Sequence, residues 1–223
     1  MLSATSDAYS VFGGNDQLVK LFFEISQAKV LLNTTITEIS KKNQSYFLST
    51  SDSVFGPFDS VVLATPIEFS NIIFNFPMVH VTPRVYHHWI VTIVTAKNLK
   101  SSYFGGISTV PDTIFTTDNS TVRFTVVHPL TNTSDGLIVY KFFSNEDISN
   151  ELPEMFDGLS STFVHYWPYT FPDLTPGIPY QPIQLEDDND GNVFYLSGMD
   201  SVATAMEAST IAGRNIALRI IGK

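Results

Sequence analysis

The sequence predicts a mixed α/β (α+β) fold, and three observations predict it. The short apolar run Val61-Val62-Leu63-Ala64 ends at Thr65-Pro66. This pattern is typical of a buried strand in an α/β sheet whose carboxyl end opens into a loop. The middle of the chain is rich in β-branched and aromatic runs. The chain ends in a strand, a glycine-containing connection and a helix. With 43% hydrophobic and 15% charged residues in 223, it is too apolar for disorder.

The first element predicted is a helix that follows the turn at Gly13-Gly14, with Asn15 as its N-cap. Its apolar residues recur at helical spacing: Leu18, Leu21, Phe22 and Ile25. Beyond Lys29 the pattern changes to β, with a polar turn at residues 41–43. The strands expected here are residues 30–32, 34–40, 45–50 and 61–64.

The middle of the chain predicts antiparallel strands separated by Gly, Pro and Asn, over residues 89–96, 122–127 and 137–143. A short helix is expected over residues 146–156. Five of the ten residues 163–172 are aromatic, and prolines interrupt and follow them. Most of these rings are expected in the core. Because proline-rich segments make poor strands, the stretch is also a candidate loop over an apolar pocket.

The last unit predicts a turn over residues 187–191, a strand over 193–196, a connection over 197–200 and a helix from Thr204 to about Ile221. Thr204 and Glu207 have the spacing of a capping box. A helix N-terminus presents amides and a positive dipole end, which suits an anionic group. The alternative is a terminal helix that only packs on a sheet.

Composition excludes several classes of site. The chain has no cysteine, so it has no disulfides, thiolate metal sites or thiol catalysis. Its net charge of −10 argues against nucleic acid as a partner. The five histidines form no metal-binding spacing, the acidic run at residues 186–190 lacks the EF-hand pattern, and no G-x-S-x-G elbow occurs. No apolar run is long enough to span a bilayer, and the first residues do not resemble a signal peptide.

Several segments follow one another in a characteristic order along the chain. They are Phe12-Gly13-Gly14-Asn15, Val61-Val62-Leu63-Ala64-Thr65-Pro66, Phe115-Thr116-Thr117-Asp118, Tyr140-Lys141-Phe142-Phe143-Ser144, His165-Tyr166-Trp167-Pro168-Tyr169, Tyr195-Leu196-Ser197-Gly198 and the helix Ala205-Met206-Glu207-Ala208-Ser209-Thr210-Ile211-Ala212-Gly213-Arg214-Asn215-Ile216-Ala217. Together they resemble the prenylcysteine oxidase (prenylcysteine lyase) family and, more distantly, flavin amine oxidases. The resemblance runs from about Tyr9 to Lys223.

The resemblance implies the C-terminal part of a two-domain FAD-dependent oxidase. Residues 1–66 and 183–223 would form an FAD-side mixed sheet, and residues 67–182 an antiparallel substrate-side sheet. The implied activity is that of a thioether oxidase, which converts farnesyl- or geranylgeranyl-cysteine to cysteine, a prenyl aldehyde and hydrogen peroxide. Molecular oxygen would be the oxidant that regenerates the flavin.

The resemblance also implies a set of site residues. FAD would contact Ile36, Thr65, Pro66, Gly198, Met199, Asp200 and Met206. The prenyl substrate would contact Tyr166, Trp167 and Tyr169. No residue of the chain is assigned an acid–base role, and no metal site is expected.

The chain departs from the family because it lacks the G-x-G-x-x-G fingerprint that cradles the FAD pyrophosphate. Two hypotheses follow. In the first, the chain is the carboxyl-terminal portion of the oxidase and is active only when the region with the fingerprint is present. In the second, it is an inactive, truncated paralogue that retains an apolar-ligand or interaction module. Family resemblance and four N-x-[ST] sequons, at Asn33, Asn43, Asn119 and Asn132, predict a glycoprotein of the lysosome or another secretory compartment.

Overall fold

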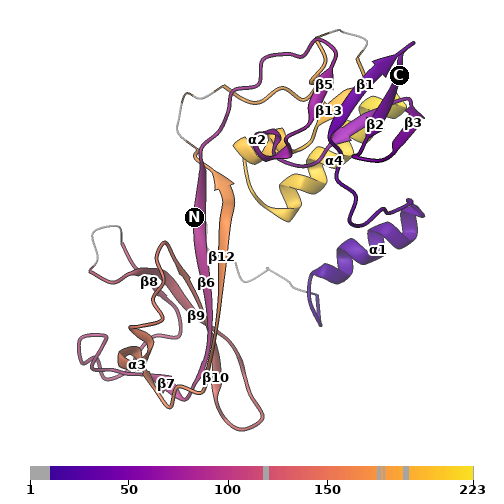
Figure 1. The fold of residues 1–223 in the computed structure, drawn as a ribbon. Helices are drawn as coiled ribbons and strands as arrows, with labels where there is room; N and C mark the ends of the chain where they lie inside the picture. The colour runs from indigo at the N-terminus through magenta and orange to yellow at the C-terminus, as the bar shows by residue number, and fades with distance from the viewer. Residues whose placement is uncertain (1–10, 118–120, 175–176, 178, 188–190, 223) are drawn as a thin grey trace. The chain divides into compact units, whose positions relative to one another are not determined.

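The structure is a computed structural model that describes residues 11–117, 121–174, 177, 179–187 and 191–222. The chain divides into two compact units (Figure 1). The first unit comprises the chain up to Phe58 together with Ile72–Asn75, and the second comprises Asp59–Asn71 and the chain from Phe76 onward. Each unit is a separate arrangement of strands and helices. The division into a cofactor side, residues 1–66 and 183–223, and a substrate side, residues 67–182, stays a prediction.

The first unit contains helix α1 and a four-stranded sheet of order β3-β2-β1-β5. Strand β1 is antiparallel to β2 and parallel to β5, and Ile39 and Tyr46 form the buried centre of the sheet. The bounds are α1 Asp16–Ser26, β1 Glu38–Lys42, β2 Ser45–Ser49, β3 Val54–Phe58 and β5 Ile73–Asn75.

The turn before α1 requires its two glycines, since Gly13 has φ +84° and Gly14 has φ +120°. Asn15 occupies the N-cap position, but its side chain accepts a hydrogen bond from the Val11 amide instead of capping the helix. The strand expected over residues 30–32 is absent, because the chain turns there and Asn33 has φ +53°. The strand expected from residue 34 begins only at Glu38.

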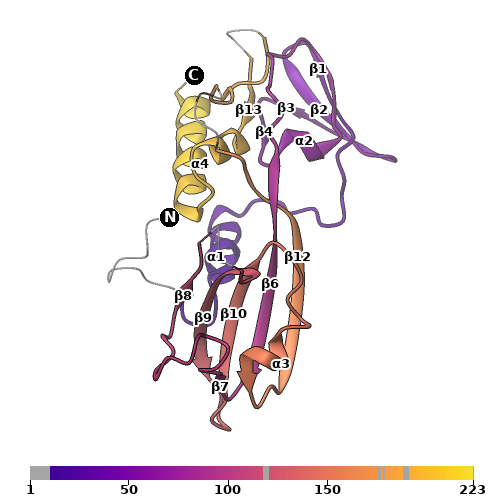
Figure 2. The same cartoon turned by 90° about the vertical axis from the view of Figure 1, so that its left-hand side faces the viewer.

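The second unit is built on a five-stranded sheet of order β12-β6-β10-β9-β8, in which all neighbours are antiparallel. Figure 2 shows β6 and β12 running side by side along the length of this sheet. A second, two-stranded sheet pairs β4 with β13 in parallel, and a third pairs β7 with β11. The strands are β4 Val61–Leu63, β6 Tyr86–Ala96, β7 Asn98–Leu99, β8 Ile114–Phe115, β9 Phe124–Asn132, β10 Ile138–Ser144, β11 Phe156–Asp157, β12 Ser161–Pro172 and β13 Val193–Tyr195.

Helices of the second unit are short except for the last. They are α2 Ile67–Ser70, α3 Leu152–Met155, the 3₁₀ turn η1 Ser197–Ser201 and α4 Met206–Ile221. Only α3 forms within the helix predicted over residues 146–156, where Pro153 at its start favours a new helix rather than the continuation of an earlier one. Among the described residues, none of the helices has the length and apolar character needed to cross a membrane.

One face of the five-stranded sheet carries the core of this unit. Val94, Tyr140 and Phe142 alternate along β6 and β10 and pack with Leu152 and Met155 of α3. The aromatic stretch predicted as core or loop is instead the long strand β12, and Ser161 to Thr170 are exposed. The register of β12 shifts between Trp167 and Phe171, so the segment with Pro168 bulges instead of pairing.

Candidate functional site

The two loops that carry the predicted cofactor contacts meet at one edge of the β4–β13 sheet. Leu63 and Tyr195 lie opposite each other in parallel strands, so both strands end on the same side. The Leu196 amide donates to the Leu63 carbonyl at 2.9 Å just beyond this pair. Thr65 and Pro66 follow β4, and η1, which contains Gly198, follows β13. The structure therefore brings residues 65–66 and 198–200 together.

Gly198 is buried at the start of η1, against the segment that precedes β13. A Cβ at this position would lie 3.2 Å from the Gln181 Cβ, 3.3 Å from a Tyr195 ring carbon and 3.4 Å from the Pro182 carbonyl oxygen. These contacts are tighter than ordinary side-chain packing. The glycine lets η1 lie directly on its neighbours.

Asp200 places a half-buried carboxylate at this edge. Burial raises the pKa of Asp200, and Glu68 raises it further, while the nearby Arg84 guanidinium opposes the shift. No hydrogen bond joins this carboxylate to the part of the chain that the structure describes. The Asp200 carboxylate can accept hydrogen bonds from the hydroxyls of a ligand.

Helix α4 contacts η1 and begins at Met206, which is exposed. The capping box predicted from Thr204 and Glu207 is wrong. The N-cap is Ala205 and makes no side-chain cap. Glu207 is then the second helical residue rather than the third, so it lacks the spacing to reach back to the cap. The first-turn amides lack a side-chain cap from this residue, and the positive end of the helix dipole lies among them.

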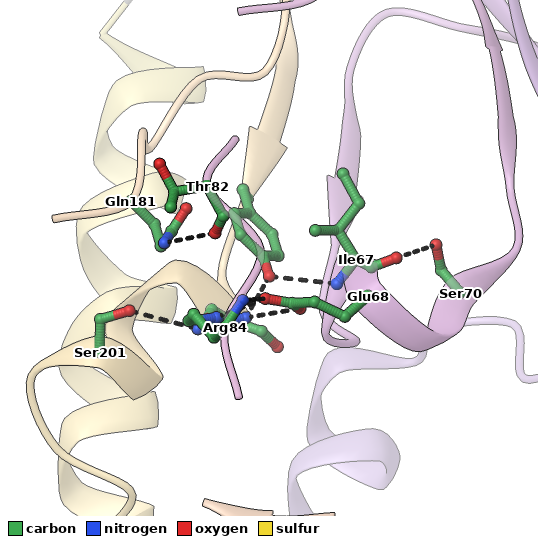
Figure 3. A network of polar contacts seen from close by, with 9 residues as sticks. Ile67, Glu68, Ser70, Thr82, Arg84, Gln181 and Ser201 are labelled. Atoms are coloured by element: carbon green, nitrogen blue, oxygen red, sulfur yellow. Dashed lines mark hydrogen bonds and ion pairs between the residues drawn. The ribbon is translucent and has the colours of Figure 1, made fainter. Parts of the chain in front are cut away.

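A buried polar network, which the sequence did not reveal, lies beside η1 (Figure 3). It joins Glu68, Arg84 and Tyr195. Burial raises the pKa of Glu68, but hydrogen bonds from Arg84 outweigh burial, so the net shift is downward. The sequence signal for this network is weak: an arginine in the apolar run Val81-Thr82-Pro83-Arg84-Val85, sixteen residues after Glu68.

The predicted substrate residues lie on and beside β12 but do not share one face. Trp167 is opposite Trp89, and the Trp89 ring meets Phe143 at 5.6 Å. Successive strand residues alternate, so these residues lie on the face opposite the buried Val94 and Phe142. We call this the open face. Its central residues are Trp89, Val91, Ile93, Lys141, Phe143, Phe163, His165 and Trp167.

Tyr166 points to the other side of the sheet, where its ring lies 5.7 Å from that of His88. Tyr169, in the bulge, stacks on Phe69 of α2 at 3.7 Å and meets Tyr86 edge-on at 6.5 Å. Tyr169 therefore lies at the end of the sheet nearest the loop that follows β4.

Ile36, the remaining predicted cofactor contact, belongs to the first unit. It is half-buried and lies two residues before β1. No cluster of three or more metal-ligating side chains occurs among the described residues.

Comparisons with known proteins agree on one family. The sequence model of the family described as prenylcysteine lyase matches residues 1–223. Farnesylcysteine lyase of Arabidopsis thaliana is 28% identical over 218 residues, which is 96% of this chain and 42% of the relative. Human prenylcysteine oxidase 1 is 26% identical over 245 residues, covering 96% of this chain and 46% of the relative. The chain thus spans less than half the length of these relatives.

Solved structures show the same fold at low identity. Cyclohexylamine oxidase from Brevibacterium oxydans IH-35A aligns with a TM-score of 0.64 and 16% identity, over 94% of this chain and 52% of that one. A putative protoporphyrinogen oxidase from Exiguobacterium sp. 255-15 aligns with a TM-score of 0.60 and 13% identity, over 93% of this chain and 52% of that one. The mixed α/β fold predicted from the sequence is confirmed, and it is the fold of these two oxidases.

Proposed function

The chain belongs to the prenylcysteine lyase family, and from this premise we propose that it acts in an FAD-dependent oxidase that cleaves the thioether of farnesyl- or geranylgeranyl-cysteine. Cysteine, a prenyl aldehyde and hydrogen peroxide would be the products, with water and molecular oxygen consumed. The observation that carries the proposal is the meeting of residues 65–66 and 198–200 at one edge of the β4–β13 sheet.

The residues at this edge fit one end of FAD. Thr65, Pro66, Gly198 and Met199 offer backbone and apolar contacts, and Asp200 offers a carboxylate that can accept hydrogen bonds from ribityl hydroxyls. The uncapped start of α4, at Met206, suits the electron-rich end of the ring system. Ile36 is proposed as the contact of the first unit. When bound, FAD supplies the hydride acceptor for oxidation of the carbon attached to sulfur.

The open face fits an apolar substrate. It presents Trp89, Phe143 and Trp167, and an isoprenoid chain would bury its surface against these rings. Tyr169 would contact the substrate at the end of the sheet nearest the loop that follows β4. Tyr166 is retained as a proposed contact, although its side chain lies on the other face.

The test uses the purified chain with added FAD and farnesylcysteine. The proposal expects a flavin absorption band that stays with the protein through gel filtration, and peroxide that forms only when farnesylcysteine is present. A protein that remains colourless and releases no peroxide contradicts oxidase activity of the chain by itself. Farnesylcysteine binding without flavin binding would instead support a non-enzymatic apolar-ligand module, which the exposed aromatic residues of β12 also favour.

Three of the predicted glycosylation sites, Asn33, Asn43 and Asn132, are exposed. Asn119 lies outside the described residues. Exposed sequons support the proposal that the protein is a glycoprotein of the lysosome or another secretory compartment. Expression in a eukaryotic cell followed by deglycosylation and gel electrophoresis tests this, since an unchanged mobility contradicts it.

A further inference from the structure

Arg84 lies in the segment that leads into β6, and its side chain is only 2% exposed. Its Nε donates to Glu68 Oε1 at 2.7 Å, and its Nη2 donates to Glu68 Oε2 at 3.0 Å. The Arg84 amide also donates to Glu68 Oε1, at 3.0 Å. Arg84 is thereby fixed to α2, the helix directly after Thr65 and Pro66.

The other side of the guanidinium holds both ends of η1. Nη1 donates to the Ser197 carbonyl at 2.8 Å and to Ser201 Oγ at 3.4 Å. Nη2 also donates to the Tyr195 hydroxyl, which accepts a second hydrogen bond from the Ile67 amide at 3.1 Å. Figure 3 shows Arg84 between Glu68 on one side and Ser201 on the other. Through one side chain, the turn after β13 is joined to the helix after β4.

The hydrogen bonds of Arg84 use every N–H donor of its guanidinium. A guanidinium has five N–H groups, one on Nε and two on each Nη. Each has its own acceptor here: both oxygens of Glu68, the Ser197 carbonyl, Ser201 Oγ and the Tyr195 hydroxyl. Lysine has three donors on one atom and cannot serve both sides at once.

We propose that Arg84 is a positioning residue that holds η1, and with it Gly198, Met199 and Asp200, in the conformation that receives the flavin. This inference rests on the proposed function. Arg84 touches neither cofactor nor substrate in this proposal and acts through η1. Because Tyr86 begins β6 two residues later, Arg84 also joins the cofactor-side turn to the first strand of the substrate-side sheet.

The experiment compares Arg84→Lys with the matched control Arg123→Lys in the full chain. Arg123 is also paired with two glutamates, Glu146 and Glu151, but it is exposed and far from η1 in the sequence. Two measurements are made on each protein: amide hydrogen exchange of Met199 and Val202, and FAD affinity from the quenching of flavin fluorescence. The exchange of Val94 and Phe142 amides reports on the core.

Arg84→Lys is expected to speed exchange at Met199 and Val202 by about tenfold or more, and to weaken FAD binding by about tenfold, with core amides unchanged. Arg123→Lys is expected to change neither. Unchanged exchange in Arg84→Lys overturns the inference. So does faster exchange with unchanged FAD affinity, because Arg84 would then be structural only.

Two further outcomes have a defined meaning. If the unmodified chain binds no FAD, the proposed function fails for the chain by itself, and with it the cofactor part of this inference, while exchange still decides whether Arg84 holds η1. If Arg84→Lys does not fold, Glu68→Gln replaces it, since this variant keeps the shape of the partner but removes its charge and one of the two oxygens that accept from Arg84. Glu68→Gln is expected to show the same two changes to a smaller extent, and no change in either overturns the inference.

Discussion

A methyl group on Gly198 would lie 3.2 Å from the Cβ of Gln181, a residue that is itself buried. The same methyl would meet the Tyr195 ring and the Pro182 carbonyl. The need for glycine in η1 therefore arises from packing within the protein, and does not depend on a ligand. A substitution here tests the packing of η1 separately from cofactor binding.

Gly198→Ala is expected to destabilise the second unit by about 1–3 kcal/mol, because extra volume in a packed site forces side chains or backbone to move. Urea unfolding measures the change. Gly213→Ala is the matched control. A Cβ at Gly213 would meet only Leu196 Cδ1, at 3.8 Å, which is ordinary contact. Because Gly213 lies inside α4, alanine there is expected to stabilise by up to about 1 kcal/mol. Equal effects of the two substitutions would contradict the packing argument.

Tyr195→Phe removes the hydroxyl that accepts from the Ile67 amide and from Arg84. Two donors would lose their partner, so we expect a loss of about 1–3 kcal/mol in the free energy of unfolding. Tyr86→Phe is the control, since its buried hydroxyl has no hydrogen-bond partner in the described part of the chain. Removing that hydroxyl is expected to leave stability unchanged or raise it. A larger loss in Tyr86→Phe than in Tyr195→Phe would refute this account.

The local pattern of the sequence predicted most strands of the second unit and the final strand–turn–helix unit. The strands around Val94, Val127 and Phe142 were expected from β-branched and aromatic runs. In the structure the first begins at Tyr86, before the predicted start, and the other two begin and end later than predicted, at Phe124–Asn132 and Ile138–Ser144. Parallel pairing of β4 with β13 makes the two loops meet, and it joins residues more than 130 positions apart. No local pattern specifies that pairing.

The errors have local causes. The stretch with Trp167 and Pro168 was expected to be core or loop, because proline disfavours paired strand, but a bulge places that segment outside the ladder of hydrogen bonds. The capping box at Thr204 failed because α4 starts two residues after it, with Ala205 as N-cap. The Glu68–Arg84 pair was missed because Glu68 lies in helix α2 and Arg84 in the segment before β6, and the two become close only after folding.

Asp200→Asn is expected to stabilise the second unit near neutral pH and to lose this advantage in acid. Burial and Glu68 raise the pKa of Asp200 above 3.8, despite Arg84. Because the pKa of Asp200 is higher in the folded state, the protonated carboxyl contributes stability that is fully present below pH 3.8. That stability is lost as the pH rises through the pKa of the folded state. Asparagine, which does not ionise, avoids that loss.

Urea unfolding at about pH 7 and about pH 3.5 gives the free energy of unfolding of the variant and of the unmodified chain. The difference between the two proteins at each pH removes the contribution of the groups that titrate in both, including Glu68. A variant that is less stable than the unmodified chain at about pH 7, or equally stabilised at both pH values, would rule out ionisation of Asp200 as the cause.

Trp167→Ala is expected to weaken farnesylcysteine binding more than Tyr166→Ala does, because the two neighbours point to opposite faces of the sheet. Trp167 lies on the open face opposite Trp89, whereas Tyr166 lies beside His88 on the other face. Both side chains are about half exposed, at 51% and 54%, so truncation removes similar packing within the protein.

Loss of the contact between the indole and an isoprenoid chain costs about 1.5–3 kcal/mol, which is about a tenfold to hundredfold rise in Kd. Titration calorimetry with farnesylcysteine makes the comparison, and circular dichroism checks that both variants fold. If Tyr166→Ala is the more damaging change, the prenyl group lies on the other face and the proposed site moves with it.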